Sequence, residues 1–193
     1  KKWFKRYERH LPNTGEIVFF DRSWYTRALV EATMGYCTKR QYTYFMKNVI
    51  PWEKKQIEEG VEFFKFYLSI EKNTQQKRID KRATSPLVYW KISENDLKML
   101  DKWDAFTLYK EQMFKRTSYD EAPWIVLNAN NKKVAILSAL RFILNAFDYP
   151  DKDLPKPKTW SEGLNNYKVE INKVLFENLS YQQYKTLRVF ADE

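Results

Sequence analysis

A short apolar run that ends in charged and hydroxyl side chains is the feature that most constrains the fold. Residues 17–20 are two β-branched and two aromatic residues, followed at once by Asp21, Arg22 and Ser23. Such a run predicts a short buried strand of a parallel sheet. Ligands of open α/β sheets bind at the carboxyl ends of the strands, where Asp21 could hold Mg²⁺ and Arg22 could neutralise phosphate. The alternative is an ordinary strand end followed by a solvated turn.

Strand-like and helix-like segments alternate along the next part of the chain. Residues 61–70 and 124–129 predict further strands, and helices are expected over 39–60, 72–83 and 131–147. This order is typical of a parallel α/β sheet with crossover helices. More than fifty residues separate the second and third expected strands, more than a crossover needs, so we expect a lid or substrate-binding insertion there.

The boundaries of the long helix over 39–60 are marked in the sequence. Thr38 is an expected N-cap, and Gly60 is suited to end the helix. Pro51 lies inside it and is expected to kink or divide it.

The composition changes at Pro150, where a charged, proline-rich connector begins. Apolar residues at helical spacing over 160–193 predict one or two amphipathic helices, which we interpret as an appendage. The expected organisation is therefore a body over 1–149, with a lid over about 72–105, and a connector with a helical tail over 150–193.

Composition narrows the classes of partner and compartment. The net charge of +9 favours polyanionic partners, although a surplus of lysine can also serve solubility alone. The single cysteine, Cys37, excludes an internal disulfide and fits a reducing cytoplasm; we expect it to pack as a small core residue. With His10 as the only histidine, a histidine-rich metal site is excluded. No segment approaches the roughly eighteen apolar residues of a membrane span, so no membrane partner is expected.

Ordered blocks of aromatic and charged residues over 1–149 resemble the family-2 polyphosphate kinases, a branch of the P-loop kinase superfamily. The most specific block is Phe20-Asp21-Arg22-Ser23-Trp24-Tyr25-Thr26-Arg27. The other matching blocks are residues 3–7, 11–18, 30–31, 34–37, 85–86, 90–93, 102–104 and 121–124, with Asp96. The resemblance implies an α/β P-loop kinase-like three-layer fold with a parallel sheet, a helical lid insertion and a C-terminal helical appendage.

One feature of that family is absent from this sequence. Its glycine-rich phosphate-binding loop of the Walker A type should lie several dozen residues before Asp21. The chain has four glycines and no Gly-x-x-x-x-Gly-Lys. We therefore expect a piece of the kinase domain that begins just before the second core strand and is not competent by itself.

The resemblance assigns roles to the residues around the turn. Asp21 fits the Walker B carboxylate that holds Mg²⁺, and Glu31 is a second, weaker candidate metal ligand. Arg22 and Arg27 are suited to bind phosphate oxygens, because a guanidinium offers a two-pronged donor. The alternative for Arg27 is an ion pair with Glu31, one helical turn later.

Basic residues in the expected insertion are candidates for a lid over phosphates. Lys77, Arg78, Lys81 and Arg82 occur at helical spacing, and Lys91 follows the break at Pro86. A mobile basic lid would exclude water and prevent hydrolysis. A run of charges can also be no more than the solvated face of a helix.

The implied reaction is Mg²⁺-dependent transfer of a phosphoryl group between inorganic polyphosphate and a nucleotide. The Asp21 form of the turn favours the diphosphates ADP or GDP as acceptors, with ATP or GTP as products. The family also implies a homo-oligomer, a dimer or a tetramer. Two other hypotheses remain: an ordinary ATP-dependent P-loop nucleotide kinase, and a non-catalytic basic module that binds nucleic acid. No nucleic-acid-binding motif supports the latter, so nucleic acid is not an expected partner.

Overall fold

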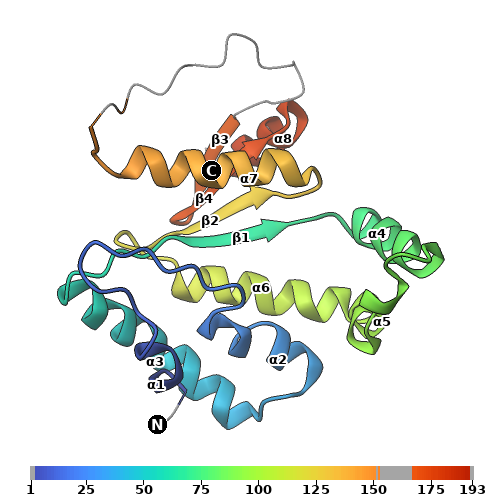
Figure 1. Ribbon diagram of the computed structural model, residues 1–193, viewed down its shortest axis with the longest axis horizontal. Helices are drawn as coiled ribbons and strands as arrows, with labels where there is room; N and C mark the ends of the chain where they lie inside the picture. Colours follow the sequence, from blue (N-terminus) through green and yellow to red (C-terminus); the bar gives the residue numbers. More distant parts are fainter. Residues whose placement is uncertain (1–2, 151, 153–166, 192–193) are drawn as a thin grey trace. The chain divides into compact units, whose positions relative to one another are not determined.

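The computed structural model describes residues 3–150, 152 and 167–191, and these form two compact units (Figure 1). The first contains the residues up to Phe63 together with Ile79–Thr117. The second contains Phe64–Arg78 and the described residues from Ser118 onward. The helix α4, Lys72–Thr84, starts in the second unit and ends in the first.

Helices make up the regular structure of the first unit. They are α1 Lys5–Glu8, η1 Trp24–Arg27, α2 Val30–Met34, α3 Lys39–Glu58, η2 Tyr89–Lys91, α5 Glu94–Asp101 and α6 Trp103–Thr117, besides the end of α4. Helices α2 and α3 both pack against α6, and the fully buried side chains at the centre include Phe45, Val49 and Met113.

The long helix α3 forms where the sequence predicts it. Thr38 and Gln41 form a capping box: the Thr38 hydroxyl accepts from the Gln41 backbone N–H, and the Gln41 side chain accepts from the Thr38 backbone N–H. Gly60 follows the helix with a φ of 94°, which a glycine adopts without strain. Of the two effects expected of Pro51, a kink or a division, division does not occur, because α3 runs through Pro51 as one helix.

The strand expected over 16–20 is not formed, and this prediction was wrong. The segment has no regular secondary structure, and Ile17 and Phe19 are 66% and 76% exposed. A strand exists only where a neighbour completes its ladder of hydrogen bonds, and no strand of the described residues pairs with this segment.

The second unit is built on a four-stranded mixed sheet in the order β1-β2-β4-β3. Its strands are β1 Lys65–Ser69, β2 Trp124–Asn128, β3 Tyr167–Ile171 and β4 Val174–Leu179. Strands β1, β2 and β4 run parallel, and β3 pairs antiparallel with β4. The central strand β2 is buried from Trp124 to Leu127, as expected of a parallel strand.

A crossover helix, α7 Lys132–Ala146, follows β2 and confirms the helix expected there. Asn131 caps it by accepting hydrogen bonds from the Lys133 and Val134 backbone N–H groups. Its Phe142 packs edge-on against Phe64 and Phe66, the latter in β1.

The tail is not wholly helical. A helix was expected to include Val169 and Val174, but these residues lie in the hairpin of β3 and β4; only the helix α8, Tyr181–Ala191, is confirmed. Asn172 and Lys173 form the turn with φ of 51° and 62°, the left-handed pair that a two-residue hairpin requires. Pairing of β4 with β2 then favours strand over helix. Most of the expected connector, and residues 160–166, lie outside the described residues.

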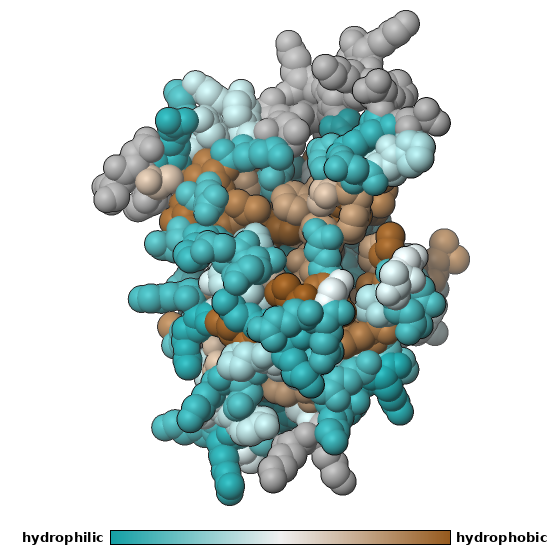
Figure 2. Space-filling view, turned by 90° about the vertical axis from the view of Figure 1, so that its left-hand side faces the viewer, coloured by the Kyte–Doolittle hydropathy of each residue, from teal (hydrophilic) through white to brown (hydrophobic). Residues whose placement is uncertain are grey.

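No helix within the described ranges is both long and apolar enough to cross a membrane. On the face shown in Figure 2, hydrophobic side chains form separate patches among many hydrophilic ones.

Candidate active site

The candidate site is the turn that follows residues 16–20. Asp21 and Arg22 are exposed, and Arg22 has a φ of 68°, in the left-handed region that side chains other than glycine seldom occupy. Ser23 then caps η1, since its hydroxyl accepts from the Tyr25 N–H at 3.4 Å. The carbonyl of Ser23 accepts from the Thr26 N–H at 3.1 Å and from the Thr26 hydroxyl at 2.5 Å.

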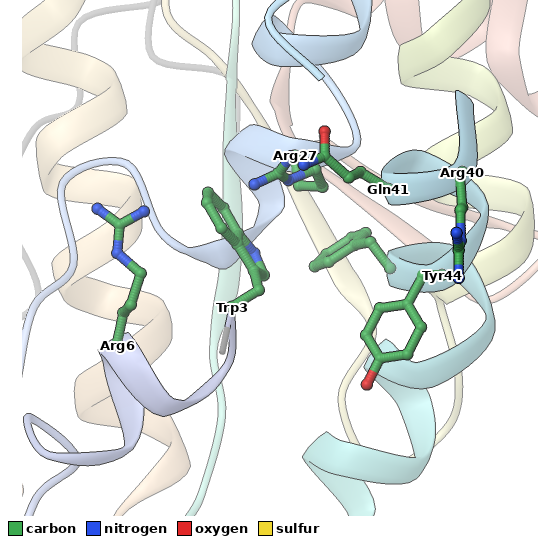
Figure 3. Close-up of a pocket in the computed structure, with 7 residues that line it drawn as sticks. Trp3, Arg6, Arg27, Arg40, Gln41 and Tyr44 are labelled. Atoms are coloured by element: carbon green, nitrogen blue, oxygen red, sulfur yellow. The ribbon is translucent and has the colours of Figure 1, made fainter. Parts of the chain in front are cut away.

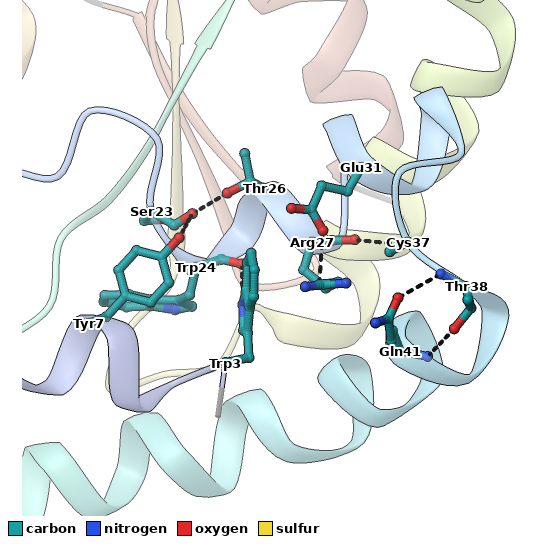
Figure 4. Close-up of polar contacts among 10 residues, drawn as sticks. All are labelled: Trp3, Tyr7, Ser23, Trp24, Thr26, Arg27, Glu31, Cys37, Thr38 and Gln41. Carbon is teal, nitrogen blue, oxygen red and sulfur yellow. Dashed lines mark hydrogen bonds and ion pairs between the residues drawn. The ribbon is translucent and has the colours of Figure 1, made fainter. Parts of the chain in front are cut away.

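Two side chains near the N-terminus, Tyr7 of α1 and Trp3 just before it, make hydrogen bonds to the backbone of this turn (Figure 4). The Trp3 indole Nε1 donates to the Trp24 carbonyl at 3.1 Å, and the Tyr7 hydroxyl donates to the Ser23 carbonyl at 3.2 Å. The backbone just after Asp21 and Arg22 is therefore held by residues 21 and 16 positions earlier in the chain.

Arg27, at the end of η1, has two partners. Its Nε lies 2.9 Å from Oε2 of Glu31, and its guanidinium carbon lies 3.9 Å from the centre of the Trp3 ring. The ion pair that the sequence offered as the alternative for Arg27 is thus present. The carboxylate of Glu31 is engaged by Arg27 and is not a free ligand.

Cys37 lies against the same helix end. Its thiol donates to the Arg27 carbonyl with a sulfur–oxygen distance of 3.8 Å. Burial raises the pKa of the Cys37 thiol, with the charge of Arg27 acting in the opposite direction. Cys37 is only partly buried and is not among the core residues, so the core position expected from the sequence is not confirmed.

The side-chain oxygens near the turn suit a Mg²⁺ ion that is bound together with substrate phosphates. Among the described residues, no group of three or more His, Cys, Asp or Glu side chains could hold a metal ion. Mg²⁺ bound with substrate phosphates needs only one or two carboxylates and keeps several waters. The exposed carboxylate of Asp21, which has no hydrogen-bond or ion-pair partner within the described ranges, fits that requirement.

The candidate lid residues on α4 differ in their surroundings. Nη2 of Arg78 donates to the carbonyls of Ala129 and Asn130, at 2.8 and 2.9 Å, and so binds the loop after β2. Lys77 and Lys81 are exposed. Arg78 therefore has a structural contact, whereas the two lysines are accessible to solvent.

The remaining candidate lid residues lie in the first unit. Arg82 is 3.8 Å from Asp96, which also accepts from the backbone N–H of Ser93 and so closes the capping box of α5. Lys91 is exposed and lies 5.0 Å from the centre of the neighbouring Trp90 ring. Trp90 is itself 68% exposed, so this segment presents both charge and an aromatic face.

A hollow of about 570 Å³ opens beside Arg27 (Figure 3). It is lined by Trp3, Arg6, Arg27, Arg40, Gln41, Tyr44 and Phe45. The guanidinium carbon of Arg6 lies 5.2 Å from the centre of the Trp3 ring, on which Arg27 also stacks. Sequence reasoning missed Arg6 and Arg40; the only local signal was basic residues next to aromatic ones at helical spacing.

Solved structures share this fold. The chain is an α/β protein with a mixed sheet, and its structural neighbours are of the P-loop kinase type. A crystal structure titled as a putative polyphosphate kinase 2 from Pseudomonas aeruginosa superposes with a TM-score of 0.69 at 36% identity, covering 73% of this chain and 30% of the other. Polyphosphate kinase 2 from Arthrobacter aurescens gives a TM-score of 0.68 at 29% identity, covering 80% of this chain and 56% of the other.

The chain belongs to the polyphosphate kinase 2 family, whose model matches residues 1–155. Polyphosphate kinase PPK2B of Corynebacterium glutamicum is 43% identical over 83% of this chain and 54% of its own length. A GDP-polyphosphate phosphotransferase of Pseudomonas aeruginosa is 45% identical over 78% of this chain and 42% of its own length. The chain thus spans about half the length of the curated relatives it matches.

Proposed function

We propose that this protein transfers a phosphoryl group between inorganic polyphosphate and a nucleoside diphosphate, ADP or GDP, with Mg²⁺. The observation that carries the proposal is the family membership of residues 1–155, which include the anchored Asp-Arg turn. Relatives at this level of identity are named GDP-, ADP- or NDP-polyphosphate phosphotransferases, which supports this class of substrate.

The chemistry of the turn supports the same reaction. Phosphoryl transfer asks a protein mainly to position the reactants and to neutralise charge. Asp21 would hold Mg²⁺, which would supply positive charge against the phosphate groups. Arg22 would bind phosphate directly, since its side chain is exposed beside Asp21. Arg27 would present its remaining guanidinium nitrogens, with Glu31 keeping it oriented.

The hollow beside Arg27 supports a place for the nucleotide. Trp3, Tyr44 and Phe45 offer aromatic faces, and Arg6, Arg27 and Arg40 offer positive charge. Flat aromatic surface next to guanidinium groups suits a nucleobase that carries phosphates. None of the described residues that line the hollow is acidic, so this lining carries no negative charge against an anion.

The basic residues of α4 and the segment after it are assigned to a lid. The exposed Lys77, Lys81 and Lys91 would meet the polyphosphate chain. Arg82 joins them if its contact with Asp96 opens, and Arg78 anchors the start of the lid to the loop after β2. Closing such a lid would exclude water from the transferred phosphoryl group.

The test uses the complete protein, supplied with ADP, polyphosphate and Mg²⁺, and measures ATP formation. Asp21→Asn should lower kcat by about 10³-fold, because the metal would lose the negative charge of its protein ligand. The matched control is Asp120→Asn, which removes a carboxylate of an exposed ion pair with Lys173 and should leave kcat unchanged.

Three results would contradict the proposal. Full activity of Asp21→Asn would remove the metal assignment. Nucleotide phosphorylation from ATP without stimulation by polyphosphate would indicate an ordinary nucleotide kinase. Affinity for single-stranded nucleic acid that survives Arg22→Ala and Lys91→Ala, with no kinase activity, would indicate a nucleic-acid-binding module.

Assembly and compartment belong to the same proposal. The family resemblance supports a dimer or a tetramer, which light scattering of the complete protein would measure. The single cysteine supports a reducing cytoplasm, which fractionation of cells would test.

A further inference from the structure

We infer that Glu53 is a positioning residue for the Asp21 turn, acting through the indole of Trp24. The inference rests on the proposed function for its kinetic consequence, but its structural basis is independent of the substrate. Glu53 lies in the middle of α3, 32 positions after Asp21, and nothing in its local sequence distinguishes it from the other acidic residues of that helix.

The carboxyl group of Glu53 is wholly buried. Its residue is 0% exposed, and its Oε1 accepts a hydrogen bond from Nε1 of Trp24 at 2.9 Å. A glutamate is almost never fully buried unless its polar atoms have partners, because removing them from water is unfavourable. The other acidic residues of α3 and its end, such as Glu58 and Glu59, are exposed. A buried acid in an otherwise amphipathic helix therefore indicates a specific task.

Trp24 is the partner, and it occupies the centre of an aromatic cluster. Its ring lies edge-on to Tyr7, Phe20, Trp52 and Phe63, with centroid distances from 4.8 to 5.6 Å. These contacts fill the space around the ring. The hydrogen bond to Glu53 adds a polar, directional contact at the indole Nε1.

Trp24 lies two positions after Arg22, the residue of the turn with a strained backbone. Arg22 keeps a φ of 68°, and such a conformation persists only where the surroundings determine it. The surroundings are Ser23, whose carbonyl is held by Tyr7, and Trp24, whose carbonyl is held by Trp3 and whose side chain is held by Glu53. Loss of the Glu53 bond frees the Trp24 indole, so that Arg22 can relax and Asp21 can change its direction.

The experiment compares Glu53→Gln with Glu53→Leu in the complete protein. Glutamine keeps a side-chain oxygen that can accept from Trp24, whereas leucine fills a similar volume without an acceptor. We expect Glu53→Gln to keep kcat within about threefold of the original, and Glu53→Leu to lower it by about 10- to 100-fold with little change in the nucleotide KM. A small displacement of positioned groups costs rates of this order.

Gln56→Leu is the matched control for stability. Gln56 lies one turn later in α3 and is 6% exposed, so its substitution also changes a buried polar side chain of the same helix. We expect it to leave kcat unchanged even if the melting temperature falls. A loss of kcat in Glu53→Leu alone would separate positioning from general destabilisation.

The indole N–H resonance of Trp24 gives a readout that does not depend on activity. In ¹⁵N-labelled protein this resonance should shift in Glu53→Leu and stay near its original position in Glu53→Gln. If the complete original protein forms no ATP from polyphosphate, the proposed function fails, while this resonance still reports whether Glu53 holds Trp24.

Trp24→Phe keeps the inference testable if Glu53→Leu does not fold. Phenylalanine retains an aromatic ring but removes the donor, so kcat should again fall with KM little changed. A folded Glu53→Leu or Trp24→Phe variant with the original kcat overturns the inference. So does a Trp24 indole resonance that is identical in the original protein and Glu53→Leu.

Discussion

Replacing Arg27 by methionine tests how the centre of the site is stabilised. Methionine keeps a long flexible side chain and removes the guanidinium, and with it the 2.9 Å ion pair to Glu31 and the stacking on Trp3. The two side chains of the pair are only 12% and 22% exposed, so solvent screens it less than a surface pair. The ion pair contributes about 1 kcal/mol, and the stacked guanidinium contributes about 1 kcal/mol.

The expected loss in the free energy of unfolding is therefore about 2 kcal/mol. With a urea dependence of about 2 kcal/mol per molar, the midpoint of unfolding should fall by about 1 M. The matched control is Lys55→Met, which removes an exposed pair with Glu59 at the same spacing, and should cost less than about 0.5 kcal/mol. Circular dichroism of the complete protein in urea measures both.

A double-mutant cycle of Arg27→Met with Glu31→Gln separates the two contributions. The coupling energy should be about 1 kcal/mol. The contribution of the Arg27 guanidinium stacked on Trp3 should persist when Glu31 is replaced by glutamine. Equal midpoints for Arg27→Met and Lys55→Met would refute the reasoning. They would show that the contacts of Arg27 contribute no more to stability than an exposed ion pair does.

Three further predictions concern the loop after β2, the sheet and the hollow. Arg78→Met should lower the free energy of unfolding by about 1–3 kcal/mol, because two backbone carbonyls lose their donor; urea unfolding measures it. Burial raises the pKa of Tyr67 to about 12, so the native state keeps a proton that the unfolded state releases near pH 10. The stability due to Tyr67 is present below pH 10 and is lost as pH rises toward 12, and Tyr67→Phe should remove this part of the pH dependence of unfolding. Tyr44→Ala should raise the nucleotide KM about tenfold without a comparable fall in kcat, because a stacking face is lost, whereas Tyr181→Ala, which replaces another exposed tyrosine, should not; equal KM values would contradict the placement of the nucleotide.

Local sequence patterns predicted those elements whose environment is complete within the chain. The helix α3 and the strand β2 formed as expected, because the capping box at Thr38 and the apolar run from Trp124 act over a few residues. The segment 16–20 has an equally strand-like sequence, but no described strand pairs with it. The prediction failed there because strand formation depends on a neighbour, which the local pattern does not specify.

The helix predicted where the hairpin of β3 and β4 lies was wrong for a related reason. Apolar residues such as Val169 and Val174 occur at spacings that suit a helix as well as strands, and short apolar runs leave the two open. The turn at Asn172 and Lys173 and the place of β4 beside β2 decide for strands. The deciding partner, β2, lies almost fifty residues earlier in the chain.

By itself, the sequence determined the family, the candidate chemistry of the Asp21 turn and the elements defined by short-range signals. Only the tertiary structure showed that Glu53 holds Trp24 and that Arg6 and Arg40 border one hollow. The physical reason is distance along the chain. Side-chain type and spacing describe what a residue can do, whereas burial and pairing depend on residues that only folding brings together.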